Sequence, residues 1–229
     1  MLWEVIMKLY MHPVSMTSRP VSLFIAENKL DCEQEVVDLM AGAHHQEPYA
    51  SLNPNRLVPM LVDGDLKLTE SSAILKYLAD KIGSPAYPKD LKQRAKVNEA
   101  MDWINTNFYR DWGYGLAYPQ LFPHHKRRSD EAHAATIEWG QRNSQNWLKL
   151  LNDYWIGPKQ YLCGDQVTIA DHFGAGIVTL GDLIGCDFAP YPNIERWLGN
   201  MKKLPSWSKV NQEFYGLRDM IKAQSFVRV

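Results

Sequence analysis

Two hydrophobic patterns follow one another along the chain, and the first predicts a small sheet with helices. Short apolar runs predict three strands, over 5–11, 32–38 and 58–62. Apolar residues at helical spacing predict two helices, over 18–27 and 70–79, with Ser18 as the N-cap of the first. Asp63-Gly64-Asp65 is typical of a hairpin turn into a fourth strand at 66–68. This order of elements predicts a small α/β or α+β layer, in which the polar stretch 41–54 is a loop with one short helix.

The second pattern begins after Pro85 and Pro88 and is helical throughout. Apolar side chains recur at helical spacing over 91–108, 131–155, 168 onward, 194–204 and 206–218. We therefore expect three parts, which are a sheet domain over 1–83, a linker over 84–90 and an all-helical domain over 91–229.

Charge and composition exclude several classes of function. The chain carries 25 Lys and Arg against 26 Asp and Glu, a balance that does not suit a nucleic-acid binder or a protein of anionic membrane surfaces. It has no apolar run of the roughly 20 residues that span a membrane, and its N-terminal segment does not have the pattern of a secretory signal. Cys32, Cys163 and Cys186 lie far apart, so neither a disulfide framework nor a thiolate metal site is expected. We expect a soluble, cytoplasmic protein without a metal ion.

Three short segments of the first part could carry chemistry, although each also has a purely structural interpretation. Pro59 cannot donate to a strand ladder; in a cis peptide bond it would leave the backbone of Val58 free to pair with a peptide, and otherwise it is an edge-strand proline. Glu70 and Ser71 begin a helix, where free N–H groups attract a carboxylate and Glu70 can hold an ammonium group; the alternative is an ordinary N-cap. Ser15 follows the first strand, at the sheet edge where ligands of open sheets bind, or it is a loop serine that satisfies local backbone.

In this order and spacing, the three segments resemble the thioredoxin-like domain of the cytosolic glutathione transferase family. The segment from Leu162 to Asp171 resembles the buried capping segment of the family's helical domain, and the stretch from Val14 to Arg19 is most similar to the theta-like, serine-type branch that is common among bacterial members. The resemblance implies a thioredoxin-like α/β domain of order βαβαββα followed by an all-α helical domain. It also implies a homodimer that serves in detoxification and takes glutathione as its co-substrate.

The resemblance implies a role for each residue that matches. Ser15 would donate a hydrogen bond to the sulfur of glutathione and so is the expected catalytic residue. Val58, next to a cis Pro59, would pair with the cysteinyl backbone. Glu70 and Ser71 would hold the γ-glutamyl ammonium and carboxylate groups.

The glycyl end of glutathione is matched less completely. His44 corresponds to a histidine near the glycyl carboxylate, and His45 stands where a lysine is often found, so both are expected to bind glutathione. Leu57 occupies a position that is often lysine in theta members, and Arg56 is the residue that could replace the lost charge.

An apolar pocket beside the sulfur should hold the second substrate. The residues expected to line this electrophile pocket are Val14, Met16, Tyr109, Trp112 and Tyr118, although the aromatic residues also fit core packing. The basic run 124–128 fits a solvated loop better than an anion site. The expected activity is attack of a serine-stabilised glutathione thiolate on a small hydrophobic electrophile to give a thioether. Glutathione-dependent dehalogenation or peroxide reduction at the same site, and a non-catalytic glutathione-fold binding module, are the alternatives.

Overall fold

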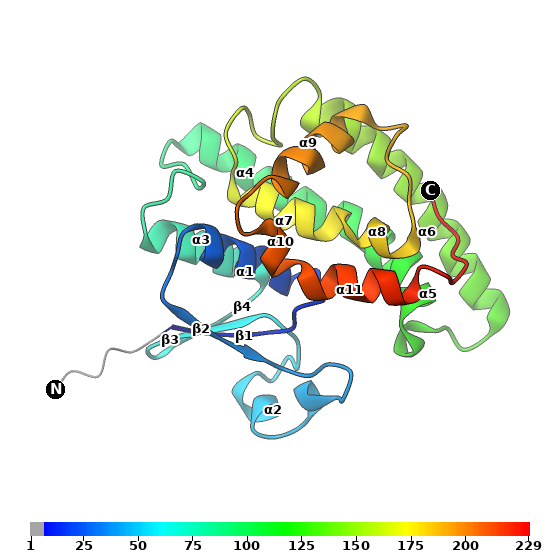
Figure 1. Cartoon of the computed structure of the whole chain (residues 1–229), viewed down its shortest axis with the longest axis horizontal. Helices are drawn as coiled ribbons and strands as arrows, with labels where there is room; N and C mark the ends of the chain where they lie inside the picture. Colours follow the sequence, from blue (N-terminus) through cyan, green and yellow to red (C-terminus); the bar gives the residue numbers. More distant parts are fainter. Residues whose placement is uncertain (1–6) are drawn as a thin grey trace.

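A four-stranded sheet with helices above and below it forms the first part of the chain in the computed structural model, which describes residues 7–229 (Figure 1). The strands are β1 (Met7–Met11), β2 (Cys32–Val36), β3 (Met60–Asp63) and β4 (Leu66–Thr69). They lie in the order β2-β1-β3-β4, with β1 and β2 parallel and β3 antiparallel to both of its neighbours. The predicted strand at 5–11 is therefore found over its described residues, and Val5 and Ile6 lie outside them.

Helices α1 (Ser18–Glu27) and α3 (Ser71–Lys81) cover the face of the sheet that looks toward the rest of the chain, and the short α2 (Tyr49–Leu52) lies on the other side (Figure 1). Helix α1 packs here because Val21, Phe24 and Ile25 share one face and are at most 3% exposed. The side that faces α2 has a separate small cluster of buried residues, Val37, Tyr49 and Val58.

The rest of the chain is helical, as the second hydrophobic pattern predicts. Its α-helices are α4 (Leu91–Trp103), α5 (Tyr118–Leu121), α6 (Asp130–Leu150), α7 (Ile169–Val178), α8 (Leu180–Ile184), α9 (Pro192–Lys202), α10 (Trp207–Val210) and α11 (Gln212–Ile221). Helix α4 runs on through the π-helical segments η2 (Ile104–Phe108) and η3 (Arg110–Ala117) into α5, and α6 runs into the similar η5 (Leu151–Ile156). Within residues 7–229, no helix combines the length and the hydropathy that a bilayer crossing requires.

Most predicted ends differ from the observed ones by a few residues, and two helices differ by more. The single helix expected over 206–218 is broken between α10 and α11, where Asn211 turns its amide group onto the carbonyl of Trp207 and onto Arg19. The helix expected to stop at residue 108 continues to residue 121, because its hydrophobic stripe resumes in a wider π-helical register that the 3.6-residue spacing does not detect.

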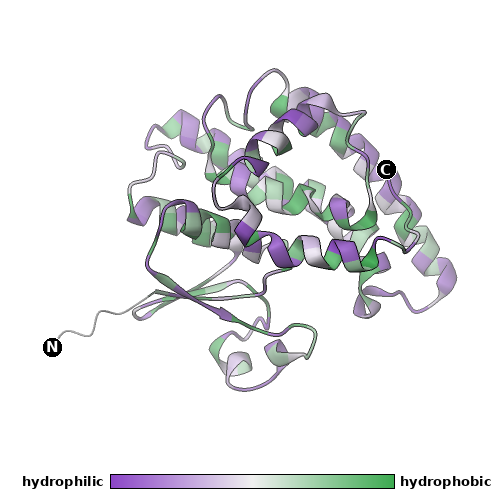
Figure 2. Cartoon of the chain, viewed as in Figure 1, coloured by the Kyte–Doolittle hydropathy of each residue, from purple (hydrophilic) through white to green (hydrophobic). Residues whose placement is uncertain are grey.

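Helix α7 is the centre of the helical part. Every residue from Ile169 to Val178 is buried, and Figure 2 shows this helix in hydrophobic colours between more polar neighbours. Thr168 and Asp171 form a reciprocal capping box at its start, as the sequence motif suggests. Gly176 lets α1 approach closely, because a Cβ at this position would stand 2.4 Å from Pro20.

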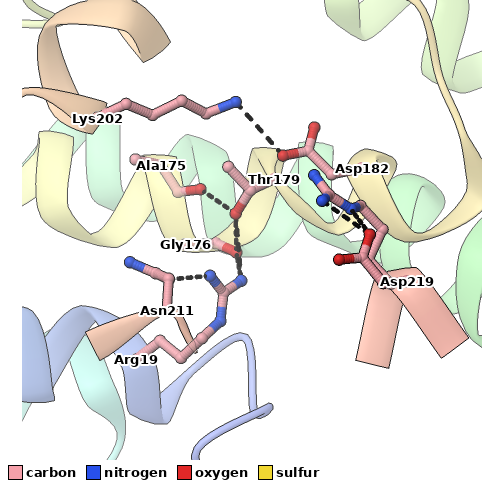
Figure 3. A network of polar contacts seen from close by, with 9 residues as sticks. Arg19, Ala175, Gly176, Thr179, Asp182, Lys202, Asn211 and Asp219 are labelled. Atoms are coloured by element: carbon pink, nitrogen blue, oxygen red, sulfur yellow. Dashed lines mark hydrogen bonds and ion pairs between the residues drawn. The ribbon is translucent and has the colours of Figure 1, made fainter. Parts of the chain in front are cut away.

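A buried arginine joins the two parts of the chain (Figure 3). Arg19 of α1 donates to the carbonyl of Gly176 at 2.9 Å, to the Thr179 hydroxyl at 3.1 Å and to the Asn211 amide oxygen. Its guanidinium carbon lies 3.7 Å from the centre of the Phe214 ring, and burial lowers the pKa of Arg19 to about 10. Because a buried charge is costly unless it is hydrogen-bonded, these contacts hold α1 in one position against the helical part.

Candidate active site

A cavity of about 520 Å³ lies between the sheet part and the helical part. Its wall includes the start of α1, the loop before β3, the start of α3 and the η3–α5 region of the helical part. Among the residues named from the sequence, the structure brings Val14, Ser15, Met16, His44, Val58, Pro59, Glu70, Ser71, Tyr109 and Tyr118 to this wall.

Ser15 lies just before α1, with its hydroxyl oxygen at the tip of that helix. The oxygen accepts the N–H groups of Thr17 at 3.3 Å and Ser18 at 3.2 Å, and it lies 3.1 Å from the hydroxyl of Thr17. These are two of the amides that a helix leaves unpaired at its positive end. The prediction that Ser18 is the N-cap of this helix is wrong: Thr17 is the N-cap residue, and Ser15 takes the free N–H groups instead.

Val58 and Pro59 are joined by a cis peptide bond, as predicted, and lie beside Ser15 in the cavity wall. The carbonyl oxygen of Val58 accepts the Thr17 hydroxyl at 3.1 Å. Among residues 7–229, no group hydrogen-bonds to the N–H of Val58, so this amide is available to a ligand. A hydrogen bond next to Val58 fixes the loop that carries it, because the Asn53 side-chain amide donates to the Leu57 carbonyl at 2.8 Å.

Glu70 and Ser71 lie at the start of α3 on the same wall. Glu70 is exposed, and no cation of the described residues pairs with its carboxylate. Its backbone has φ 64° and ψ 112°, a conformation that residues with a side chain rarely adopt and that costs of the order of 1–3 kcal/mol. Ser71 is only 6% exposed and opens the helix, so its N–H group lies among the free amides at the tip. An acid beside free amides suits a ligand that carries an ammonium and a carboxylate group.

Of the two histidines expected at the glycyl end of glutathione, only His44 lines the cavity. His44 lines the cavity, and burial, with help from the nearby His45 and His124, lowers its pKa, so the ring is neutral at pH 7. The ring of His45 lies 3.9 Å from that of His44, centre to centre, and is tilted by 43° to it, but His45 is exposed and does not reach the wall. Arg56 and Leu57 do line the cavity, and Leu57 is 62% exposed.

Aromatic side chains form the wall on the helical side of the cavity that Ser15 also lines. Tyr109 and Tyr118 are buried, their hydroxyl groups hydrogen-bond to each other, and burial raises the pKa of both, so both stay protonated at neutral pH. The ring of Tyr114 lies 5.3 Å from that of Tyr109, centre to centre, and the ring of His125 lies 5.2 Å from that of Tyr118. This wall therefore offers apolar ring faces together with phenol groups that can donate.

Trp112 is not part of this wall, so its expected place in the electrophile pocket is wrong. Its side chain is fully buried in the helical core, where the indole N–H donates to the Ile177 carbonyl at 3.1 Å. The opposite error concerns His124 and His125, which were expected in a solvated loop and which line the cavity instead. Thr17, Arg110 and Tyr114, which belong to segments that the sequence singles out, also line the cavity. Other wall residues that no sequence signal marks are Leu39, Met40, Asn53, Asn55, Thr69, Ser72, Asn105, Phe122 and Phe173.

A sheet of this topology with a cavity against an all-helical part defines the class as a thioredoxin-like domain joined to a helical one. The sequence profile of the glutathione S-transferase N-terminal domain matches residues 5–80. Human glutathione S-transferase theta-1 is 33% identical over an alignment of 201 residues, and the match covers 83% of this chain and 80% of the human protein. Human glutathione S-transferase theta-2 is 31% identical, with 86% of this chain and 80% of that protein covered.

Solved structures give the same result. The apo form of human glutathione S-transferase T1-1 has a TM-score of 0.80 at 29% identity, and the match covers 93% of this chain and 91% of the human chain. Human glutathione transferase theta-2, in complex with glutathione and an unknown ligand, has a TM-score of 0.84 at 27% identity. This match covers 97% of the present chain and 93% of the human one. The chain belongs to the glutathione S-transferase family. It is a glutathione transferase, an enzyme that binds glutathione; its expected place in a bacterial serine-type branch stays a prediction.

Proposed function

We propose that Ser15 stabilises the thiolate of bound glutathione, which then attacks a hydrophobic electrophile held by the aromatic wall. The observation that carries this proposal is the hydrogen bonding of Ser15. Its oxygen already accepts two N–H groups at the positive end of α1, so the group it can offer to a ligand in the cavity is its proton. A hydroxyl donor at a helix tip favours an anion over its protonated form.

The energy required from this arrangement is modest. A free thiol has a pKa of about 8.5, so only a few per cent is thiolate at neutral pH. Lowering that pKa by about two units needs about 2.7 kcal/mol of preference for the anion. A hydrogen bond to a charged group contributes about 1.5–3 kcal/mol, so Ser15 and the helix tip together suffice.

Glutathione would lie with its γ-glutamyl end at α3. Glu70 would accept the ammonium group, and the N–H groups at the start of the helix, with Ser71, would bind the carboxylate. The free N–H of Val58 would donate to the carbonyl of the cysteinyl residue, which places the sulfur near Ser15. His44 and Arg56 line the remaining part of the wall and would face the glycyl carboxylate.

The reaction follows from this placement. The thiol proton leaves to solvent when the thiolate forms, and a sulfur lone pair makes the new carbon–sulfur bond. The electron pair of the broken bond leaves with the displaced group, or stays on an oxygen that then takes a proton. Val14, Met16, Tyr109 and Tyr118 would hold the electrophile beside the sulfur.

The division into domains over 1–83 and 91–229 with a linker over 84–90, and assembly as a homodimer, also belong to this proposal. The cavity at the junction of the sheet part and the helical part supports the first. Family membership supports the second, and sedimentation of the full chain at micromolar concentration tests it.

The experiment that tests the role of Ser15 is a pH titration of bound glutathione, followed by the ultraviolet absorbance of the thiolate. Ser15→Ala should raise the midpoint by about one unit or more, because it removes a charge-assisted hydrogen bond. Ser51→Ala is the matched control, since Ser51 is exposed in α2 and lies outside the cavity wall. An unchanged midpoint in Ser15→Ala would refute the role. A panel of aryl halides, alkyl halides, epoxides and hydroperoxides then identifies the second substrate from the products formed.

A further inference from the structure

Thr17 lines the cavity and contacts two residues that the proposed reaction uses, although that reaction gives Thr17 itself no role. Its hydroxyl lies 3.1 Å from the Ser15 oxygen and 3.1 Å from the Val58 carbonyl oxygen. It therefore joins the start of α1 to the loop before β3, across 41 positions of sequence. Both of its partners are residues to which the proposed function gives a contact with glutathione, and the inference rests on that function.

The direction of these hydrogen bonds follows from counting protons. A carbonyl oxygen can only accept, so the single proton of the Thr17 hydroxyl is donated to Val58. The Ser15 oxygen accepts two N–H groups, from Thr17 and Ser18, which use both of its lone pairs. In the bond between the two hydroxyls, the donor is therefore Ser15 and the acceptor is Thr17.

We propose that Thr17 is a positioning residue that accepts the Ser15 proton while the sulfur is protonated and releases it when the thiolate forms. A thiol sulfur is a weak acceptor, so the Ser15 proton stays on Thr17 as long as the ligand is neutral. A thiolate is a much stronger acceptor, and the proton turns to it. Thr17 thus competes with the sulfur for one proton, and this competition limits how far the site can favour the anion.

The sign of the expected effect separates this role from a merely structural one. Thr17→Val keeps the shape of the side chain and removes both the acceptor that competes for the Ser15 proton and the donor to the Val58 carbonyl. Loss of the competing acceptor should let the bound thiol ionise more easily. The midpoint of the thiolate titration should fall by about 0.7 pH unit. This shift is the contribution of one neutral hydrogen bond to the free energy, converted at about 1.4 kcal/mol for each pH unit. Loss of a merely structural support would leave Ser15 less well placed and would raise the midpoint.

Two further variants complete the experiment. Thr17→Ser keeps the hydroxyl and should keep the wild-type midpoint. In Ser15→Ala the proton in question is gone, so adding Thr17→Val should produce no further shift, which makes the two effects non-additive. The Thr17 side chain does not cap α1, so these changes leave the helix start intact, and Thr17→Ala offers a second removal of the acceptor if Thr17→Val folds poorly.

The outcomes distinguish this inference from the proposed function. A midpoint in Thr17→Val that equals or exceeds that of the wild type overturns the role of Thr17, as does a shift that persists in the Ser15→Ala background. If Ser15→Ala itself leaves the midpoint unchanged, the proposed role of Ser15 fails first. If Ser15→Ala raises it and Thr17→Val does not lower it, only the inference on Thr17 fails.

Discussion

Replacement of Asp171 by alanine should be among the most destabilising single changes in this protein. The carboxylate is fully buried at the start of α7 and accepts four hydrogen bonds. Its donors are the Leu162 N–H at 2.8 Å, the N–H and hydroxyl of Thr168 at 2.8 Å each, and the Trp197 indole at 2.9 Å. These bonds tie the segment before α7, the helix itself and α9 to a single side chain.

The size of the effect follows from those donors. Each is buried, and a buried donor left without an acceptor costs about 1–3 kcal/mol. Part of that cost is recovered, because the variant no longer buries a charge, and burial raises the pKa of Asp171 in the wild type. We expect the free energy of unfolding to fall by about 4 kcal/mol. This is a large part of the total, since folded proteins are stable by only about 5–15 kcal/mol. For a chain of this length, that lowers Tm by about 8–16 °C.

Urea denaturation gives the free energy of unfolding, and a thermal scan gives Tm. Asp165→Ala is the matched control, because Asp165 is an exposed carboxylate six positions earlier, and it should stay within about 0.5 kcal/mol of the wild type. A loss below about 1 kcal/mol in Asp171→Ala would show that the four hydrogen bonds do not hold the helical part together. Since Asp171 lies outside the cavity wall, the folded fraction should bind glutathione with wild-type affinity.

Two further predictions concern the cavity and the response to acid. Glu70→Gly should weaken glutathione binding by calorimetry as much as Glu70→Ala does, yet it should raise Tm relative to Glu70→Ala, because glycine adopts the φ of 64° without strain; equal Tm values in the two variants would contradict this. Burial lowers the pKa of His172, so its neutral form stabilises the fold above the unfolded pKa of about 6.5, and this contribution is lost as the pH falls below that value. His172→Gln should therefore lose less stability between pH 7 and pH 5 than the wild type, by up to about 1.4 kcal/mol per pH unit, in urea titrations; parallel pH curves would count against it.

The sequence by itself determined the elements and the part of the site that depends on local chemistry. The presence and order of the strands and helices in the sheet part followed from apolar periodicity and from turn residues such as Gly64, while their ends differ by one or two residues. Ser15, Pro59 and Glu70 could be picked out because each follows or begins a regular element, and the ends of elements meet at one edge of a sheet. Thr168 and Asp171 form a local motif, three positions apart, that needs no distant partner to be recognised.

The tertiary structure alone decided which aromatic and polar residues face the cavity. Trp112 and Tyr118 are both aromatic residues of one continuous helical run, but only the packing of that run decides that Tyr118 reaches the wall and that Trp112 enters the core. His125 gains its place only because its segment folds back onto Tyr118. The bond from Thr17 to Val58 joins residues 41 positions apart, and such a contact depends on strand order and helix docking, which periodicity along a single chain does not encode.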